Sequence, residues 1–330
     1  MISVIGAILS LVFQCISFNE VIEGLFSSSS INPIKILLLF LSMTFLSIFL
    51  DEVGFFKFLA SLLLRKCKSN QHTLFVMLYI LVSILTIFTS NDIVILTFTP
   101  FICYFSKNAN INPIPYLVAE FSAANTWSMM LIIGNPTNIY LATSAGITFI
   151  EYVKIMFIPT VLAGLVQIFI MILLFNKTLN KPIELEGKQK RIKDKVSLII
   201  GLDHLIACLI LLIVSSYVNL PMWIICVFCA ISLFFSITLY YKIKHRSFFT
   251  LKHTFARLPW NLIPFVISMF IIVLSLNKQG VTTVIGGFLG SEQIVYRYGF
   301  ASFLSSNFIN NIPKVTNINF GKKFNSGLEI

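Results

Sequence analysis

The chain has 330 residues, of which 57% are hydrophobic and 11% are charged, and its formal net charge is +11. A soluble domain carries about a quarter charged residues, and its core could not bury this much apolar surface. The composition therefore excludes an ordinary soluble protein and predicts an all-α polytopic membrane protein. Apolar runs of membrane-spanning length recur along the whole chain. They cover 1–18, 33–50, 73–106, 116–175, 198–215, 219–240 and 261–277.

The positive charge gathers between these runs. Sixteen of the 24 Lys and Arg residues lie in four segments, 65–71, 107–115, 176–197 and 242–258. Such a bias marks cytoplasmic loops. A basic patch for nucleic acid is the alternative, but no aromatic interleaving or recognisable module accompanies the charge. We therefore expect a multi-pass plasma-membrane protein with a cytoplasmic N-terminus, with the lipid bilayer as partner and without nucleic acid. The first run lacks a basic head and a cleavage site, which favours a retained helix.

The sequence offers no catalytic or metal-binding set. Its six cysteines have no paired metal spacing, and its four histidines are scattered. Cys226 and Cys229 lie one helical turn apart, a spacing that is more typical of packing than of ligation. No nucleotide-binding loop of the G-x-x-x-x-G-K-[ST] type is present. We therefore expect that the protein is not an enzyme and needs no cofactor beyond a coupling ion, sodium or a proton.

The run 73–106 carries three polar residues, Ser90, Asn91 and Asp92, in the middle of apolar sequence. It lies between two basic segments, so it should enter and leave the membrane on the same side. Two arms of about 15 residues reach about 22 Å each, short of the roughly 30 Å hydrocarbon core. This predicts a re-entrant hairpin with a buried polar tip. Two full spans, with Asn91 and Asp92 capping a helix, are the alternative.

A second interruption lies within 116–148. It consists of Gly134, Asn135, Pro136, Thr137 and Asn138. Proline removes a helix donor and restricts the residue before it, and an unwound break at membrane depth needs protein or water to satisfy the freed groups. The pattern predicts a discontinuous helix, with an ordinary proline kink as the alternative. Glu120 and Thr126, on the arm leading to the break, could line a pathway, although Glu120 could also be solvated.

The chain also repeats itself. Two segments resemble each other, each a span that ends in a short amphipathic stretch, with Gly54 matching Gly280; they are 48–63 and 273–290. After the second copy an apolar arm leads to Asn310 and Asn311, which would form a second polar tip or, alternatively, an ordinary loop. The count of basic loops gives the two copies opposite directions across the membrane. This predicts inverted repeats, an architecture of many secondary transporters.

These motifs resemble the ion transporter superfamily, especially its arsenite-permease, NhaD-like antiporter and citrate-transporter-like branch. The matching stretches are "TSNDIVILTFTPF", "AANTWSMMLIIGNPTNIYLATSAG", "LPWNLIPFVISMFIIVLSL" and "SSNFINNIP". The resemblance implies an elevator-type fold with re-entrant hairpins and discontinuous helices. It also implies residues that bind substrate or ion in three places: the first tip (Ser90, Asn91, Asp92), the first unwound loop (Gly134 to Asn138) and the second tip (Asn310, Asn311). The first tip is the expected sodium site.

The expected organisation has four parts. They are a first repeat over 1–175, a basic cytoplasmic loop over 176–197, a linker helix with a partial second repeat over 198–313, and a polar, disordered tail over 314–330. The tail "KVTNINFGKKFNSGLEI" is too polar to form the apolar return arm with which the family continues. We therefore expect a C-terminally truncated second repeat. One alternative hypothesis is that the protein is a truncated remnant that does not transport.

The leading functional hypothesis is secondary transport of a small anion, citrate or a dicarboxylate, coupled to sodium or protons. Arsenite or antimonite efflux and sodium/proton exchange are alternatives on the same fold. A channel would instead give conductance without coupled flux. A membrane-embedded hydrolase is disfavoured because no His, Asp and Ser set converges. The sequence leaves a homodimer open.

Overall fold

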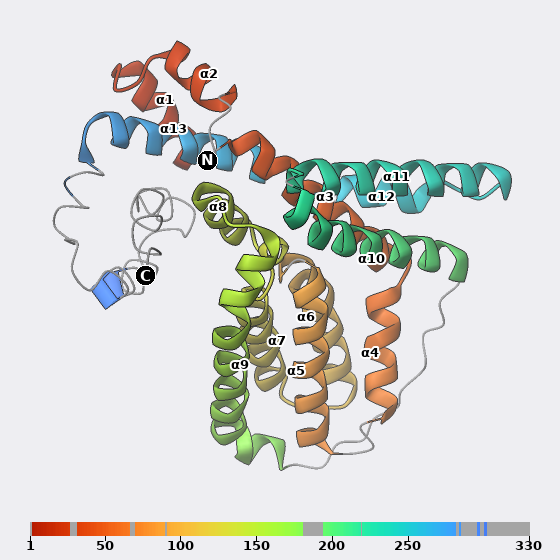
Figure 1. Ribbon diagram of the computed structural model, residues 1–330. Helices are drawn as coiled ribbons and strands as arrows, with labels where there is room; N and C mark the ends of the chain where they lie inside the picture. The colour runs from red at the N-terminus through yellow and green to blue at the C-terminus, as the bar shows by residue number, and fades with distance from the viewer. Residues whose placement is uncertain are drawn as a thin grey trace. The chain divides into compact units, whose positions relative to one another are not determined.

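The computed structural model describes residues 2–26, 32–66, 70–89, 91–180, 194–218 and 220–281, with a few positions beyond (Figure 1). Three predicted site residues, Ser90, Asn310 and Asn311, lie outside the described residues. Every element in the described part is an α-helix, apart from one 3-10 turn. The chain forms two compact units, one of 1–38, 136–148 and 259–330, the other of 39–135 and 149–258.

The first unit contains α1 (Ile2–Val12), α2 (Phe18–Phe26), α8 (Pro136–Ala145) and α13 (Leu262–Lys278). Helix α3 (Pro33–Glu52) begins in this unit and ends in the other. The second unit contains α4 (Phe55–Lys66), α5 (Gln71–Phe88), α6 (Asn91–Asn108), α7 (Ile114–Trp127), the 3-10 turn η1 (Ile132–Gly134), α9 (Phe149–Leu179), α10 (Lys195–Val218), α11 (Met222–Ile243) and α12 (Phe249–Ala256).

Five described helices are long and apolar enough to cross a membrane: α3, α5, α9, α10 and α11. On α9, large apolar side chains point outward; Leu165, Phe169 and Leu173 are 57%, 62% and 62% exposed. Such a surface suits lipid tails, and helices suit the bilayer because their backbone groups are paired internally. The fold class expected from composition, an all-helical polytopic membrane protein, agrees with this structure.

One expected span is shorter than the sequence suggested. The run 1–18 contains α1, whose 11 residues reach about 16 Å, followed by a turn at which Gln14 adopts a left-handed φ of 54°. Helix α1 instead packs against α13 within the first unit. Ala7 of α1, Ile16 and Val21 form one apolar cluster with Ile271 of α13.

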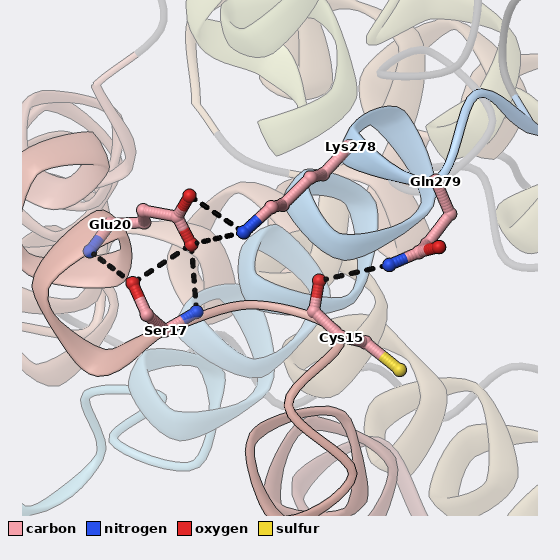
Figure 2. Close-up of polar contacts among 5 residues, drawn as sticks. All are labelled: Cys15, Ser17, Glu20, Lys278 and Gln279. Atoms are coloured by element: carbon pink, nitrogen blue, oxygen red, sulfur yellow. Dashed lines mark hydrogen bonds and ion pairs between the residues drawn. The ribbon is translucent and has the colours of Figure 1, made fainter.

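Helix α2 begins with a capping box, drawn in Figure 2. The backbone N–H of Ser17 donates to Glu20 Oε2 at 2.8 Å, and the N–H of Glu20 donates to Ser17 Oγ at 3.3 Å. This pairing satisfies two amides that the first turn of a helix leaves open. Lys278 Nζ at the end of α13 lies 2.7 Å from Glu20 Oε1. Its hydrogen bond, together with those from Ser17, lowers the pKa of Glu20 to about 2.

In the second unit, α5, α6, α7 and α9 lie side by side as a helical bundle (Figure 1). Tyr116 of α7 is fully buried between the rings of Phe75 and Phe105, with ring centroids 6.2 and 5.5 Å away. Its hydroxyl donates to Gln71 Oε1 at 2.9 Å. A buried tyrosine usually needs such a partner, so the bond fixes the start of α7 against the start of α5.

Helices α10 and α11 pack as a pair, joined at one end by Asp194. Asp194 precedes α10 and accepts from the N–H of Ser197 at 3.2 Å, as an N-cap does, while Arg246 after α11 forms an ion pair with it. Burial acts to raise the pKa of Asp194, but the bonds from Ser197 and the Arg246 charge outweigh it, and the pKa lies below its ordinary value.

A second ionic cluster joins the end of α3 to the residues around α12. Arg257 Nη1 lies 2.7 Å from Asp51 Oδ2 and also contacts Glu52. His253 Nδ1 lies 2.9 Å from Glu52 Oε2. Asp51 is only 1% exposed, so its charge depends on Arg257 for compensation.

Arg257→Gln should therefore lower the free energy of unfolding by about 3–5 kcal/mol, because it leaves a buried carboxylate unpaired. Arg246→Gln is the matched control. That pair is more exposed, at 45% for Arg246 and 16% for Asp194, and its loss should cost about 0–1 kcal/mol. Thermal unfolding of both variants in the same detergent gives the comparison. Equal losses would contradict a buried role for Asp51.

Candidate functional site

The first polar tip lies between α5 and α6. Helix α5 ends at Phe88, after which the N–H and hydroxyl of Thr89 both donate to the Leu85 carbonyl, at 3.0 and 2.6 Å. Helix α6 begins at Asn91, whose side-chain oxygen accepts from the N–H of Asp92 at 2.9 Å. Asn91 is buried and Asp92 is exposed. The tip thus presents the first turn of a helix, which contains Asp92.

The arms of this hairpin are longer than the sequence suggested. Helices α5 and α6 have 18 residues each, about 27 Å at helical rise. Helix α5 alone is long and apolar enough to cross a membrane. The re-entrant path of 73–106 therefore stays a prediction. The local bond between Asn91 and Asp92 is also the geometry that a simple helix cap would have.

The second interruption begins earlier than the sequence suggested and shares Gly134 and Asn135 with the predicted stretch. The sequence pointed to Gly134 through Asn138, but α7 already ends at Trp127, and the irregular stretch runs from Ser128 to Asn135. Pro136 begins α8 rather than breaking a helix, since the first helical position needs no N–H donor. Thr137 and Asn138 follow in the first turn of α8, within the first unit, and Asn138 is buried.

Gly134 has a steric reason to be glycine. The stretch folds back on the end of α7, and a Cβ at Gly134 would lie 2.3 Å from the Ser128 carbonyl oxygen. The N–H of Gly134 donates to the Leu131 carbonyl at 3.2 Å. Asn135, next along the chain, is extended, with φ −159° and ψ 140°. A tight turn therefore lies between Ser128 and Gly134.

The tip and the break lie at the same end of the bundle in the second unit. Near the start of α7, Tyr116 bonds to Gln71 at the start of α5, and at its end Trp127 Nε1 donates to Tyr79 Oη at 3.1 Å. The two helices are therefore parallel, and the break follows α7 toward the end of α5 that leads to Thr89. Consistent with this order, η1 packs against both α5 and α9.

Helix α6 gives the same result from the opposite direction. Phe105 contacts Tyr116, whereas Thr99, earlier in α6, bonds to Glu120, later in α7. The two helices are therefore antiparallel, and the start of α6 at Asn91 approaches the level at which α7 ends. The first tip and the break therefore lie toward the same end of the bundle, and their meeting in one site stays a prediction.

A polar network holds the end of α7, and sequence reasoning missed most of it. Tyr79 Oη donates to the Gly164 carbonyl at 2.8 Å and lies 2.9 Å from Gln167 Oε1. Gln167 Nε2 donates to Thr126 Oγ1 at 2.8 Å. A Cβ at Gly164 would lie 2.5 Å from the Trp127 ring, so only glycine allows this contact. Thr126, predicted as pathway-lining, therefore serves as an acceptor in this network.

Glu120 is buried in the bundle and is 1% exposed, so the solvated alternative is wrong. The Thr99 hydroxyl lies 3.1 Å from each of its carboxyl oxygens, and no described basic side chain forms an ion pair with it. Two further buried hydroxyls, Thr86 on α5 and Thr97 on α6, have no partner among the described residues. They flank the tip by a few residues in sequence, and the motifs of the sequence did not point to them.

Interrupted helices that meet inside an apolar bundle are typical of polytopic membrane transport proteins, because irregular backbone survives at membrane depth only within protein or beside a cavity. The chain belongs to the citrate transporter family, whose family model matches residues 1–321. It is a multi-pass membrane protein, with several apolar helices of spanning length.

Curated relatives carry names of transport proteins. A Dictyostelium discoideum protein named as transporter arsB is 32% identical over 177 residues, which cover 54% of this chain and 30% of the relative. The arsenical pump membrane protein of Escherichia coli is 26% identical over 293 residues, which cover 84% of this chain and 66% of the relative. A silicon efflux transporter of Oryza sativa subsp. japonica is 27% identical over 163 residues, which cover 49% of this chain and 32% of the relative. The chain thus spans less than two thirds of the length of each of these relatives.

Gly134→Ala should destabilise the break, at a cost of about 1–3 kcal/mol, because the new methyl group would strike backbone. Gly6→Ala is the control, since its nearest neighbour is the movable Cδ1 of Ile272 at 3.0 Å. Thermal unfolding combined with the fluorescence of Trp127, at the end of α7, reports both stability and local change. A Gly134→Ala variant that behaves like Gly6→Ala would show that the turn has room to shift.

Proposed function

We propose that the protein is a secondary transporter that exports a small uncharged hydroxide of a metalloid, with arsenite as the first substrate. One observation carries the choice of substrate. The segments around the tip and the break, 85–97 and 126–138, contain no Lys, Arg or His. They offer amide, hydroxyl and backbone groups together with one acid, Asp92. Such groups suit a neutral hydroxide, whereas a tricarboxylate needs cationic partners or several helix N-termini.

The names of the relatives support this chemistry. Two of them are named for arsenical pumping and for silicon efflux. Fully protonated arsenite and silicic acid are both small, uncharged and rich in hydroxyl groups, so one kind of site could serve either. Each hydroxyl both donates and accepts, as do the side chains of Asn91, Thr86 and Thr97 taken together.

Citrate is the second candidate, favoured by the description of the family model. Its negative charge would have to be met by the first turn of α6, because helix N-termini bind anions in other proteins. If citrate is the substrate, neutralising Asp92 should raise the affinity for citrate. If the substrate is uncharged, the same change should leave its affinity unaltered.

Alternating access in this proposal rests on inverted repeats, and two helix ends support them. Gly54 after α3 and Gly280 after α13 both adopt left-handed backbone, with φ of 92° and 74°. Each glycine N–H donates to the carbonyl three residues earlier, at 2.8 and 3.0 Å, and each carbonyl accepts from the amide four residues later, at 2.9 and 3.1 Å. When Gly54 is aligned with Gly280 without gaps, Pro33 aligns with Pro259 and Ser42 aligns with Ser268. The proposal includes a plasma-membrane location with a cytoplasmic N-terminus.

Coupling to protons is assigned to Glu120. A buried carboxyl without a basic partner among the described residues is costly to ionise, and acids at membrane depth are by default functional. The Thr99 hydroxyl can donate to the ionised form or accept from the protonated one, so the position tolerates both states. Sodium at Ser90, Asn91 and Asp92 is the alternative coupling site and stays a prediction, since Ser90 lies outside the described residues.

Arsenite should change the fluorescence of Trp127 in a protein in which Trp223 and Trp260 are replaced by Phe, whereas citrate should not. Asn91→Ala should weaken this response about tenfold, the cost of one or two lost hydrogen bonds. Asn125→Ala is the matched control, because the side-chain amide of this exposed residue donates to the Phe121 carbonyl of its own helix. Uptake of arsenite into everted membrane vesicles measures transport itself. A response to citrate alone would reverse the order of the two candidates.

Glu120→Gln should abolish uptake driven by a proton gradient while leaving the arsenite response of Trp127 within about twofold, because the amide keeps the bond to Thr99 but carries no exchangeable charge. Glu151→Gln, at an exposed position in the first turn of α9, controls for loss of an acid. Undiminished proton-driven uptake in Glu120→Gln would remove this residue from the coupling step and leave sodium at the tip as the mechanism to test.

A further inference from the structure

A cavity of about 350 Å³ lies in the second unit between α3, α11 and the end of α12. Its walls are apolar apart from Ser42. They include Phe45 of α3, Ala230 and Phe234 of α11, and Phe255 and Leu258 at α12 and just after it. The volume falls within the range of small-molecule sites, roughly 300–1,000 Å³. None of these residues belongs to the tip, the break or the polar network, so the cavity is separate from the proposed transport site.

The cavity reaches the outer surface of the unit. Three of its lining residues are strongly exposed: Ile231 at 51%, Phe235 at 64% and Phe255 at 40%. On the surface of a membrane-spanning helix such side chains face lipid. A cavity that is apolar inside and opens between lipid-facing side chains favours an acyl chain over a water-soluble ligand.

Unpaired positive charge lies beside this cavity. Lys252 is exposed and precedes Phe255 by three residues on α12, so the two side chains share one face of the helix. Lys242 and Lys244, at the end of α11, are exposed as well. None of the three lysines has an acidic partner among the described residues.

The acids in this part of the unit are already occupied. Asp194 pairs with Arg246, and Asp51 and Glu52 pair with Arg257. These ion pairs leave the lysines as the excess charge around α12. A cluster of basic residues next to a spanning helix attracts anionic headgroups, with a contribution of about 1 kcal/mol for each Lys or Arg near the surface.

We propose that this cavity and Lys252 form a binding site for an anionic phospholipid, with an acyl chain between Phe45, Phe234 and Phe255 and the headgroup phosphate at Lys252. The acyl chain of the lipid supplies affinity by burying its methylene groups, and Lys252 supplies the preference for a negatively charged headgroup. This site goes beyond the proposed transport function and does not depend on it.

The test uses full-length protein freed of lipid in detergent, with native mass spectrometry to measure bound lipid. Phosphatidylglycerol and phosphatidylcholine with identical acyl chains are compared. The wild-type protein should retain phosphatidylglycerol more strongly. Lys252→Gln should weaken phosphatidylglycerol binding about fivefold and leave phosphatidylcholine unchanged. Ala230→Phe, which fills the cavity, should weaken both lipids.

Lys177→Gln is the matched control, because Lys177 is an exposed lysine in the last turn of α9, away from the cavity. Its effect on either lipid should be less than twofold. Thermal unfolding without lipid checks that each variant is folded, and Ser42→Leu offers a second way to fill the cavity if Ala230→Phe is unstable. Equal retention of the two lipids by the wild-type protein, or an equal loss in Lys177→Gln and Lys252→Gln, would overturn the proposal.

Discussion

The structure depends on one constraint, the satisfaction of backbone hydrogen bonds where water is scarce. A helix meets it automatically, but the stretch from Ser128 to Asn135 does not. Tight turns meet part of the need: the N–H of Met129 donates to the Thr126 carbonyl, and that of Met130 to the Trp127 carbonyl, at 3.3 and 3.2 Å. Side chains from α5 and α9 bond to the side chains of Thr126 and Trp127, and so hold the end of α7 from which the break begins.

The two buried carboxyl groups, Asp51 and Glu120, differ in whether a basic side chain compensates their charge. Asp51 is paired with Arg257, and the pair joins the end of α3 to the residue after α12, which is a structural use of an ion pair. Glu120 is equally buried but has only the Thr99 hydroxyl as its described partner. A carboxyl in that position gains little from staying ionised. The contrast between the two acids is the physical basis for assigning structure to one and proton coupling to the other.

Several sequence-based predictions failed at the boundaries of elements. The sequence pattern places Pro136 within the break, whereas the structure starts α8 there, because proline is disfavoured inside a helix and favoured at its first position. The N-terminal run was interpreted as one span, although hydropathy alone does not reveal that the helix ends at Val12. The sequence does not point to Tyr79 and Gln167, because a single polar residue in an apolar helix carries no local pattern that indicates its partner.

By itself the sequence determined the membrane class, the all-helical fold, the family and the existence of two polar interruptions, because these follow from local composition and from short motifs. Tertiary structure decided which polar groups meet. The parallel packing of α7 on α5 and its antiparallel packing on α6 direct the break toward the end of the bundle that holds the tip, and they bury Glu120 beside Thr99. Contacts between residues far apart along the chain depend on how helices pack, and helical periodicity does not encode which helix is the neighbour or at what level it lies.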